Sequence, residues 1–196
     1  MGHDTRVSFI LTRGISICPI GAVSIDILAF LSECIFRRCG LECHFTPEME
    51  NPGYAYDEVR CQYQAKIILK RIIQGRPPNT LKTIGITHVD LFVPILKFVF
   101  GLSQIDGPCA VISTHRLRPE FYDQPPDQDL FWARLEKTTI HELGHAFGLT
   151  HCRDYRCVMF SSTSIENTDR KRPEFCHSCR ELFYWYLDQS TRYPDQ

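Results

Sequence analysis

Residues 141–151 read HELGHAFGLTH, and the fold that the sequence predicts is built outward from this stretch. His141 and His145 are four residues apart, just over one turn of an α-helix. Both imidazoles would therefore project from one helix face, where they can bind a single metal ion. Ile140 and Leu143 fall on roughly the opposite face and would anchor the helix in a core. The stretch predicts a metal site on a core-packed helix.

The same stretch continues past the expected helix end to a third histidine. Gly148 can adopt the left-handed backbone conformation of a sharp turn, which would return His151 to the ion bound by His141 and His145. Catalytic zinc usually takes three protein ligands and a water. Glu142 would lie beside that water and take its proton rather than bind the metal. The spacing therefore predicts a catalytic zinc in a hydrolase.

The residues before this stretch indicate where its helix begins. Asp127 follows a pair of prolines and is a favourable N-cap, and Asp129 suits the positive end of the helix dipole. The helical pattern runs to Phe147, and Gly148 is expected to end it.

The first half of the chain alternates between strand-like and helix-like segments. This alternation predicts an α/β fold, in which a mixed sheet contains parallel strands joined by crossover helices. Strands are expected at residues 15–18, 41–46, 82–87, 98–102 and 110–113, helices at 23–38 and 58–74, an irregular stretch at 150–175, and a closing helix at 181–187.

Four of the ten cysteines follow the histidines closely. A Cys-x4-Cys pair followed by a Cys-x2-Cys pair is typical of a closed four-thiolate zinc site. Disulfides are the alternative, disfavoured because an intracellular chain rarely keeps them. His177 lies inside the second pair and could replace a thiolate, but the four cysteines already suffice as ligands. We therefore expect a structural zinc bound by Cys152, Cys157, Cys176 and Cys179.

His151 and Cys152 are neighbours that are assigned to different metal ions. Successive side chains of an extended segment point to opposite sides, so one short segment can serve both sites. The structural zinc would then position the third histidine and hold the irregular stretch. This coupling is a hypothesis: replacing Cys152 or Cys157 with serine should reduce metal occupancy at the histidines.

The other six cysteines are scattered through the first 110 residues. Free cysteine commonly behaves as a small buried hydrophobe, and this interpretation is favoured for all six. Only Cys34, Cys39 and Cys43, with His44, form a group for which a metal role stays open. The six are Cys18, Cys34, Cys39, Cys43, Cys61 and Cys109.

Composition limits the other classes of function. With 196 residues, 43% of them hydrophobic, the chain can bury one core and at most a small appendage. Its 22 Lys and Arg against 23 Asp and Glu leave no basic excess for nucleic acid or a membrane surface. The apolar residues 15–31 are interrupted by Pro19, Gly21 and Asp26 and lack a signal-peptide cleavage site. We expect a cytoplasmic monomer.

Several stretches together resemble the archaemetzincin family. HELGHAFGLTHC at residues 141–152, CVM at 157–159 and CHSC at 176–179 match its hallmark, a metzincin zinc motif joined to a four-cysteine zinc site. The resemblance covers roughly residues 15–187 and is strongest from Asp90 onward. Shorter matches are PIG at 19–21, DLFVP at 90–94, FVFG at 98–101 and RLRPEFY at 116–122.

The resemblance implies a compact metzincin-like domain with a twisted mixed β-sheet and a small zinc-pinned C-terminal part. It also implies that Met159 forms the Met-turn beneath the three histidines. Metzincins commonly bind substrate along an antiparallel edge strand, and residues 98–107 are the candidate here. Phe160 and Ser161 occupy positions where some metzincins carry a tyrosine proton donor, so the resemblance does not supply that donor.

Together these patterns predict a zinc-dependent metallopeptidase with two zinc ions and a peptide or protein substrate. The alternative is a zinc-dependent binding protein or a processing enzyme for a single substrate, which the small size favours. Glu142 favours the enzyme, because a purely structural site of three histidines has no need for a carboxylate there. We expect one catalytic domain over residues 1–196, with a sheet-containing part at about 1–148 and a C-terminal part at about 149–196.

Overall fold

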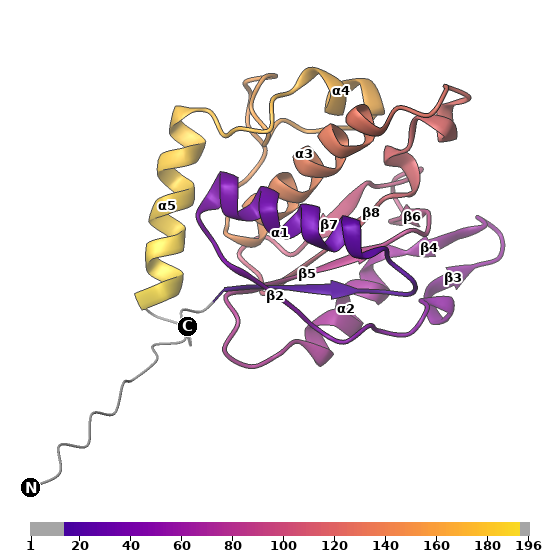
Figure 1. Cartoon of the computed structure of the whole chain (residues 1–196), viewed down its shortest axis with the longest axis horizontal. Coiled ribbons are helices and arrows are strands. Elements are labelled where there is room, and N and C mark those ends of the chain that lie inside the picture. The colour runs from indigo at the N-terminus through magenta and orange to yellow at the C-terminus, as the bar shows by residue number, and fades with distance from the viewer. Residues whose placement is uncertain (1–13, 193–196) are drawn as a thin grey trace, which may run out of the picture.

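A twisted five-stranded sheet forms the centre of the computed structural model, which describes residues 14–192 (Figure 1). Four strands are parallel, and the strand at one edge, β7, runs antiparallel to its neighbour β8. This arrangement is the mixed α/β sheet predicted from the sequence. In spatial order the strands are β2 (Cys43–Phe45), β1 (Ile15–Pro19), β5 (Lys82–Thr87), β8 (Cys109–Ser113) and β7 (Gly101–Ser103).

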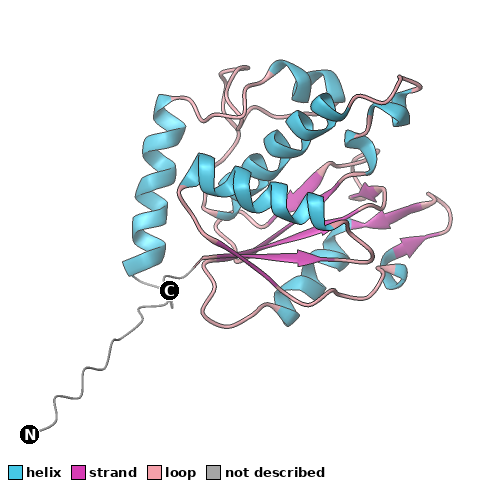
Figure 2. Ribbon diagram, viewed as in Figure 1, coloured by secondary structure: helices cyan, strands magenta, loops and turns pink. Residues whose placement is uncertain are grey.

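Helices cover both faces of this sheet (Figure 2). In β8, Ala110 and Ile112 point into the core shared with α1 (Ile25–Cys39) and α3 (Gln128–Ala146). Cys109 and Val111 point to the opposite face, which packs against α2 (Ala65–Gly75). Burial on both faces explains why the central strands read as continuous apolar runs rather than as alternating ones.

Local capping explains where α1 begins and ends and where α3 begins. The Ser24 side chain accepts a hydrogen bond from the Ile27 amide at 3.4 Å, and α1 ends at Gly40 with a left-handed φ of 70°. The Asp127 side chain accepts from the Leu130 amide at 2.9 Å, which confirms the predicted N-cap of α3.

The helix predicted at residues 58–74 starts later in the structure than the sequence predicts. The chain first forms a hairpin of β3 (Tyr56–Asp57) and β4 (Gln62–Gln64), and β4 pairs with β6 (Leu91–Phe92) in a second, small sheet. Cys61 has a φ of 54°, which a helix interior does not accommodate. The helix therefore starts only at Ala65, after this turn.

Other elements also differ from the prediction. The irregular stretch contains a short helix, α4 (Ile165–Arg170), and the closing helix α5 (His177–Arg192) is longer than expected. The strand expected at 98–102 is β7, shifted towards the C-terminus. Single-turn 3-10 helices occur at Gly53–Ala55, His115–Leu117 and Pro119–Tyr122.

The scattered cysteines mostly behave as expected. Cys18, Cys34, Cys39 and Cys109 are buried, and the Cys34 thiol donates to the Leu31 carbonyl at 3.3 Å. Cys43 is half-buried. The buried interpretation is wrong for Cys61, which is exposed because it occupies the tip of the β3–β4 hairpin. Over residues 14–192, no helix combines the length and apolar character needed to cross a membrane.

Candidate metal centre

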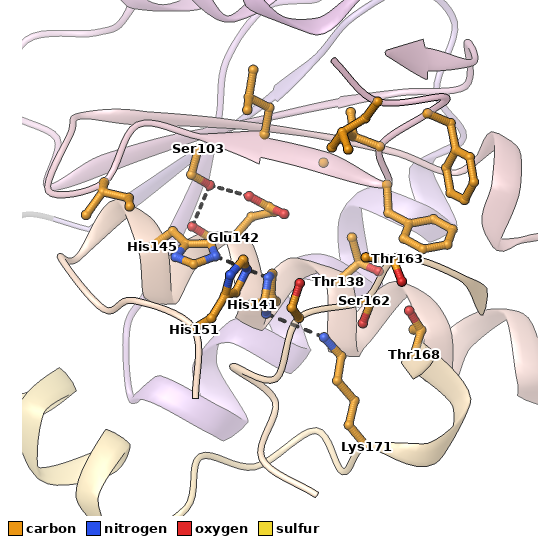
Figure 3. A pocket seen from close by; sticks show the side chains of 18 of the residues that line it. Ser103, Thr138, His141, Glu142, His145, His151, Ser162, Thr163, Thr168 and Lys171 are labelled. Atoms are coloured by element: carbon orange, nitrogen blue, oxygen red, sulfur yellow. Dashed lines mark hydrogen bonds between the residues drawn. The ribbon is translucent and has the colours of Figure 1, made fainter. Parts of the chain in front are cut away.

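The structure brings the three predicted histidines together. His141 and His145 lie one turn apart on α3, with ring centroids 4.6 Å apart. The His151 ring lies 5.4 Å from that of His141 and 4.8 Å from that of His145. All three can place a ring nitrogen within 4.8 Å of the others. Figure 3 shows the three rings converging below β7.

A turn at Gly148 returns the chain to the first two histidines. α3 ends at Ala146, and Gly148 has a φ of 97°, in the left-handed region that favours glycine. A Cβ there would also lie 3.0 Å from the Tyr186 ring of α5. After the turn, the Leu149 carbonyl accepts a hydrogen bond from His145 Nδ1 at 2.7 Å. The turn therefore orients His145 as well as returning His151.

The hydrogen bonds of the two helical histidines fit a bound cation. Nδ1 of His141 and of His145 must carry the proton, because each faces a backbone carbonyl, Val158 at 2.8 Å and Leu149 at 2.7 Å. Burial lowers the pKa of both imidazoles, which favours the neutral ring whose Nε2 bears a lone pair. These lone pairs face one another at 3.2 Å.

Two facing lone pairs repel unless a cation lies between them. Tetrahedral zinc with bonds of about 2.0–2.1 Å to nitrogen separates two ligand nitrogens by about 3.3 Å. The observed 3.2 Å separation matches this value. The donor set and its spacing therefore fit zinc.

Glu142 lies between the two histidines and is only 6% exposed. Burial raises the pKa of this carboxyl group to about 7, against the opposing effects of a hydrogen bond from Ser103 and the charge of Lys171. The Ser103 hydroxyl lies 2.5 Å from Glu142 Oε2 and 2.8 Å from the Glu142 carbonyl. A carboxylate held in this way can accept a proton near neutral pH.

The four predicted cysteines form a second cluster, in which all ligand atoms lie within 4.8 Å of one another. Sγ of Cys152 and Sγ of Cys176 are 3.8 Å apart. Tetrahedral zinc with bonds of about 2.3 Å to sulfur gives a sulfur–sulfur separation of about 3.8 Å. Backbone amides of Asp154 and Cys176 donate to two of the sulfurs, an arrangement that stabilises thiolates. The cluster also fits zinc.

His177 does not join the cysteine cluster. Its ring is exposed and lies 3.2 Å from the Glu181 carboxylate, one turn further along α5.

Met159 is fully buried beneath α3. A Cβ at Gly144 would collide with the Met159 sulfur, so the glycine between the two helical histidines allows this close packing.

A cavity of about 520 Å³ connects the histidines to the edge of the sheet. Residues 98–103, which include β7, line one side of it. The opposite side is formed by the loop after Met159 and by α4. A substrate in this cavity would contact both walls and the three histidines.

Comparison with known proteins agrees with this geometry. Residues 49–184, more than half of the chain, match Peptidase family M54. The archaemetzincin of Methanocaldococcus jannaschii is 39% identical over 170 residues, which cover 87% of this chain and 92% of the relative. The archaemetzincin of Pyrococcus furiosus is 41% identical over 171 residues, covering 84% and 89%. The chain belongs to Peptidase family M54.

Solved members of the family have the same fold. The archaemetzincin of Methanopyrus kandleri superposes with a TM-score of 0.78 at 34% identity, covering 91% of this chain and 98% of the solved one. That of Archaeoglobus fulgidus gives 0.74 at 30% identity, covering 86% and 98%. The predicted resemblance to archaemetzincins is confirmed. As a family member, the chain is a zinc metallopeptidase with peptide or protein substrates.

Sequence reasoning missed several polar residues of this cavity, among them Ser103 and Lys171. Ser103 lay within the predicted edge strand, but nothing in its spacing connected it to Glu142. Lys171 stands between two arginines in a polar stretch, a pattern typical of a solvated surface. It is in fact 3% exposed, and burial lowers the pKa of its ammonium group to about 8.

Proposed function

We propose that this metallopeptidase cleaves peptide bonds at the three histidines, with Glu142 as the general base. The observation that carries the proposal is the pair of Nε2 lone pairs facing one another at 3.2 Å, next to a buried carboxylate. His141, His145 and His151 would hold the catalytic zinc. The four cysteines Cys152, Cys157, Cys176 and Cys179 would hold a second, structural zinc.

Bound zinc supplies Lewis acidity towards the scissile carbonyl and the attacking water. Glu142 takes a proton from that water and delivers it to the leaving amine. The Ser103 hydroxyl holds the carboxylate in place and lies within reach of both Oε2 and the backbone carbonyl of the same residue. The carbonyls of Val158 and Leu149 fix the orientations of the two helical imidazoles.

The edge strand β7 provides a template for the substrate backbone. It pairs with β8 on one side only and lies at the end of the sheet. An extended peptide can add to such an edge through main-chain hydrogen bonds. Because Gly101 and Ser103 of this strand lie against Glu142, a peptide bound there passes close to the general base.

The remaining predictions concern the number of domains, the oligomeric state, the location and the partners of the chain. Phe147, Met159 and Phe183 belong to one hydrophobic core, which supports a single catalytic domain that spans the predicted boundary near residue 148. The monomeric state, the cytoplasmic location and the lack of nucleic-acid or membrane partners stay predictions.

The test is cleavage of a diverse peptide library, analysed by mass spectrometry, with the metal content measured first. Glu142→Gln is the matched variant, because it preserves the shape of the side chain but cannot accept the proton. We expect two zinc ions per chain in both proteins, and cleavage only by the wild type.

Cleavage that persists in Glu142→Gln would refute the role of Glu142 as general base. No cleavage by wild-type protein carrying both metals would refute general peptidase activity. That result would favour the processing of a single substrate.

A further inference from the structure

The cavity extends past His141 to a buried lysine that the proposed reaction does not use. In Figure 3, Lys171 reaches towards His141 on the side away from His145 and His151. Its ammonium lies 3.4 Å from His141 Nδ1 and donates to the Phe160 carbonyl at 3.2 Å. The first of these contacts is not a hydrogen bond, because Nδ1 already donates its proton to a backbone carbonyl.

Lys171 is therefore a buried cation with unused donors. An ammonium group has three N–H donors, and here one of them has a backbone acceptor. Within residues 14–192, no aspartate or glutamate forms a salt bridge with it. The Glu142 carboxylate acts on Lys171 through its charge, without a direct ion pair. A buried ammonium without a directly bound anion is costly, so a group of opposite charge at this position would be favoured.

Hydroxyl groups surround this end of the cavity. Thr138 lies one helical turn before His141, and Thr168 is 1% exposed on α4. The Ser162 hydroxyl is buried without a hydrogen-bond partner among residues 14–192. All three line the cavity together with Lys171. An ammonium and nearby hydroxyl donors are the groups that bind a carboxylate.

We propose that this end of the cavity binds a carboxylate of the substrate, so that the peptidase prefers an acidic residue next to the scissile bond. The inference rests on the proposed function. A single imidazole ring separates Lys171 from the Nε2 of His141, and the scissile carbonyl would lie beyond that nitrogen, beside the metal that it would bind. Neighbouring residues of an extended peptide are spaced by about 3.3 Å, so the side chain adjacent to that carbonyl can reach the ammonium.

The carboxylate can come from two sources, an internal aspartate or glutamate or the C-terminus of a short peptide. Both present the same anion to Lys171. Peptides capped as C-terminal amides contain only the first source, and free-acid peptides without acidic residues contain only the second.

The binding test uses the inactive Glu142→Gln protein loaded with zinc, so that it does not depend on turnover. Two fluorescent amide-capped peptides carry Glu or Gln at one position and are otherwise identical; a third, the Gln peptide as free acid, tests the terminal carboxylate. Fluorescence anisotropy gives their affinities. We expect the Glu peptide or the free acid to bind about tenfold more tightly than the amide-capped Gln peptide, the effect of a buried charge-assisted contact. The peptide positions at which the wild type selects residues in the cleavage library show where to place Glu or Gln. If the wild type cleaves nothing, Glu and Gln are compared at each position of the peptide in turn.

Lys171→Met should abolish this preference, and Lys171→Arg should retain part of it. Lys137→Met is the matched control, because Lys137 is also buried on this side of α3 and donates to a backbone carbonyl, but does not line the cavity. Thr138→Val provides a second variant should Lys171→Met fail to fold.

Equal affinity for all three peptides would overturn the proposal, as would a preference that survives in Lys171→Met. Its failure is separable from that of the proposed function. A binding preference without any cleavage by the wild type would support the carboxylate site and refute the peptidase activity. Cleavage that depends on Glu142 but shows no acidic preference would refute the carboxylate site alone.

Discussion

Replacing Cys176 with serine would show whether the cysteine cluster holds the histidine site in place. Cys176 lies in the loop before α5, and its Sγ is 3.8 Å from Cys152 Sγ. Its backbone amide donates to Cys157 Sγ at 3.3 Å. Serine has nearly the same shape but lacks the soft thiolate that zinc prefers, so Cys176→Ser should empty the cluster.

The cluster is connected to the histidines through the backbone. Cys157 precedes Val158, whose carbonyl orients His141 at 2.8 Å. Cys152 follows His151 directly in the sequence, and its amide donates to the Met159 carbonyl at 2.9 Å. Loss of such orienting contacts costs about 10–100-fold in metal affinity. The expected effect on the histidine site is therefore about 1.4–2.7 kcal/mol.

The assay is metal content after equilibration with graded concentrations of a chelator. Cobalt substitution distinguishes the two sites, because thiolate ligands give strong charge-transfer bands and imidazoles do not. Cys61→Ser is the control, since this exposed cysteine lies in the distant β3–β4 hairpin. Circular dichroism before each titration shows that the variant is folded.

We expect Cys176→Ser to hold one metal ion, bound at the histidines and removed at a chelator strength about 10–100-fold lower than in the control. A removal curve that coincides with that of Cys61→Ser would refute the coupling. The two metal sites would then be independent, although they share neighbouring residues.

Three further substitutions test the remaining physical arguments. Ser103→Ala removes a hydrogen bond that lowers the pKa of Glu142, so the acidic limb of the pH–activity profile should move to higher pH, with kcat/KM reduced about tenfold or more below neutrality. Glu136→Gln should make the free energy of urea unfolding less sensitive to acid. Burial raises the pKa of Glu136, but hydrogen bonds from two arginines of α1 lower it overall. The carboxylate therefore stabilises the fold fully above the usual carboxyl pKa, and this stabilisation is lost as the pH falls through the pKa of the folded state. Gly148→Ala should lower the unfolding free energy by about 1–2 kcal/mol in the same assay, because it forces a left-handed alanine against Tyr186.

Each of these has a result that would contradict it. An unchanged acidic limb in Ser103→Ala would mean that the serine does not influence the base. A pH dependence of unfolding identical to that of the wild type would remove Glu136 from the acid response. An undiminished unfolding free energy in Gly148→Ala would show that the turn accommodates a side chain without strain.

Short-range sequence patterns were sufficient to predict the helix and the turn that bring the three histidines together. The spacing of His141 and His145 follows from the helical repeat, and a glycine at 148 is needed for the left-handed turn that returns His151. The hairpin before α2 was missed because its second strand, β4, pairs with β6, which lies about thirty residues further along the chain.

The sequence by itself predicted the two sets of candidate metal-binding side chains, and it determined the α/β class and the family, because these depend on local periodicity and on residue type at fixed spacing. Only the tertiary structure decided what faces the histidines. Ser103 reaches Glu142 across 39 positions of the chain, and Lys171 reaches His141 across 30. Such contacts arise from the packing of β7 and the loop after α4 against α3, and packing between distant segments leaves no periodic trace in a single sequence.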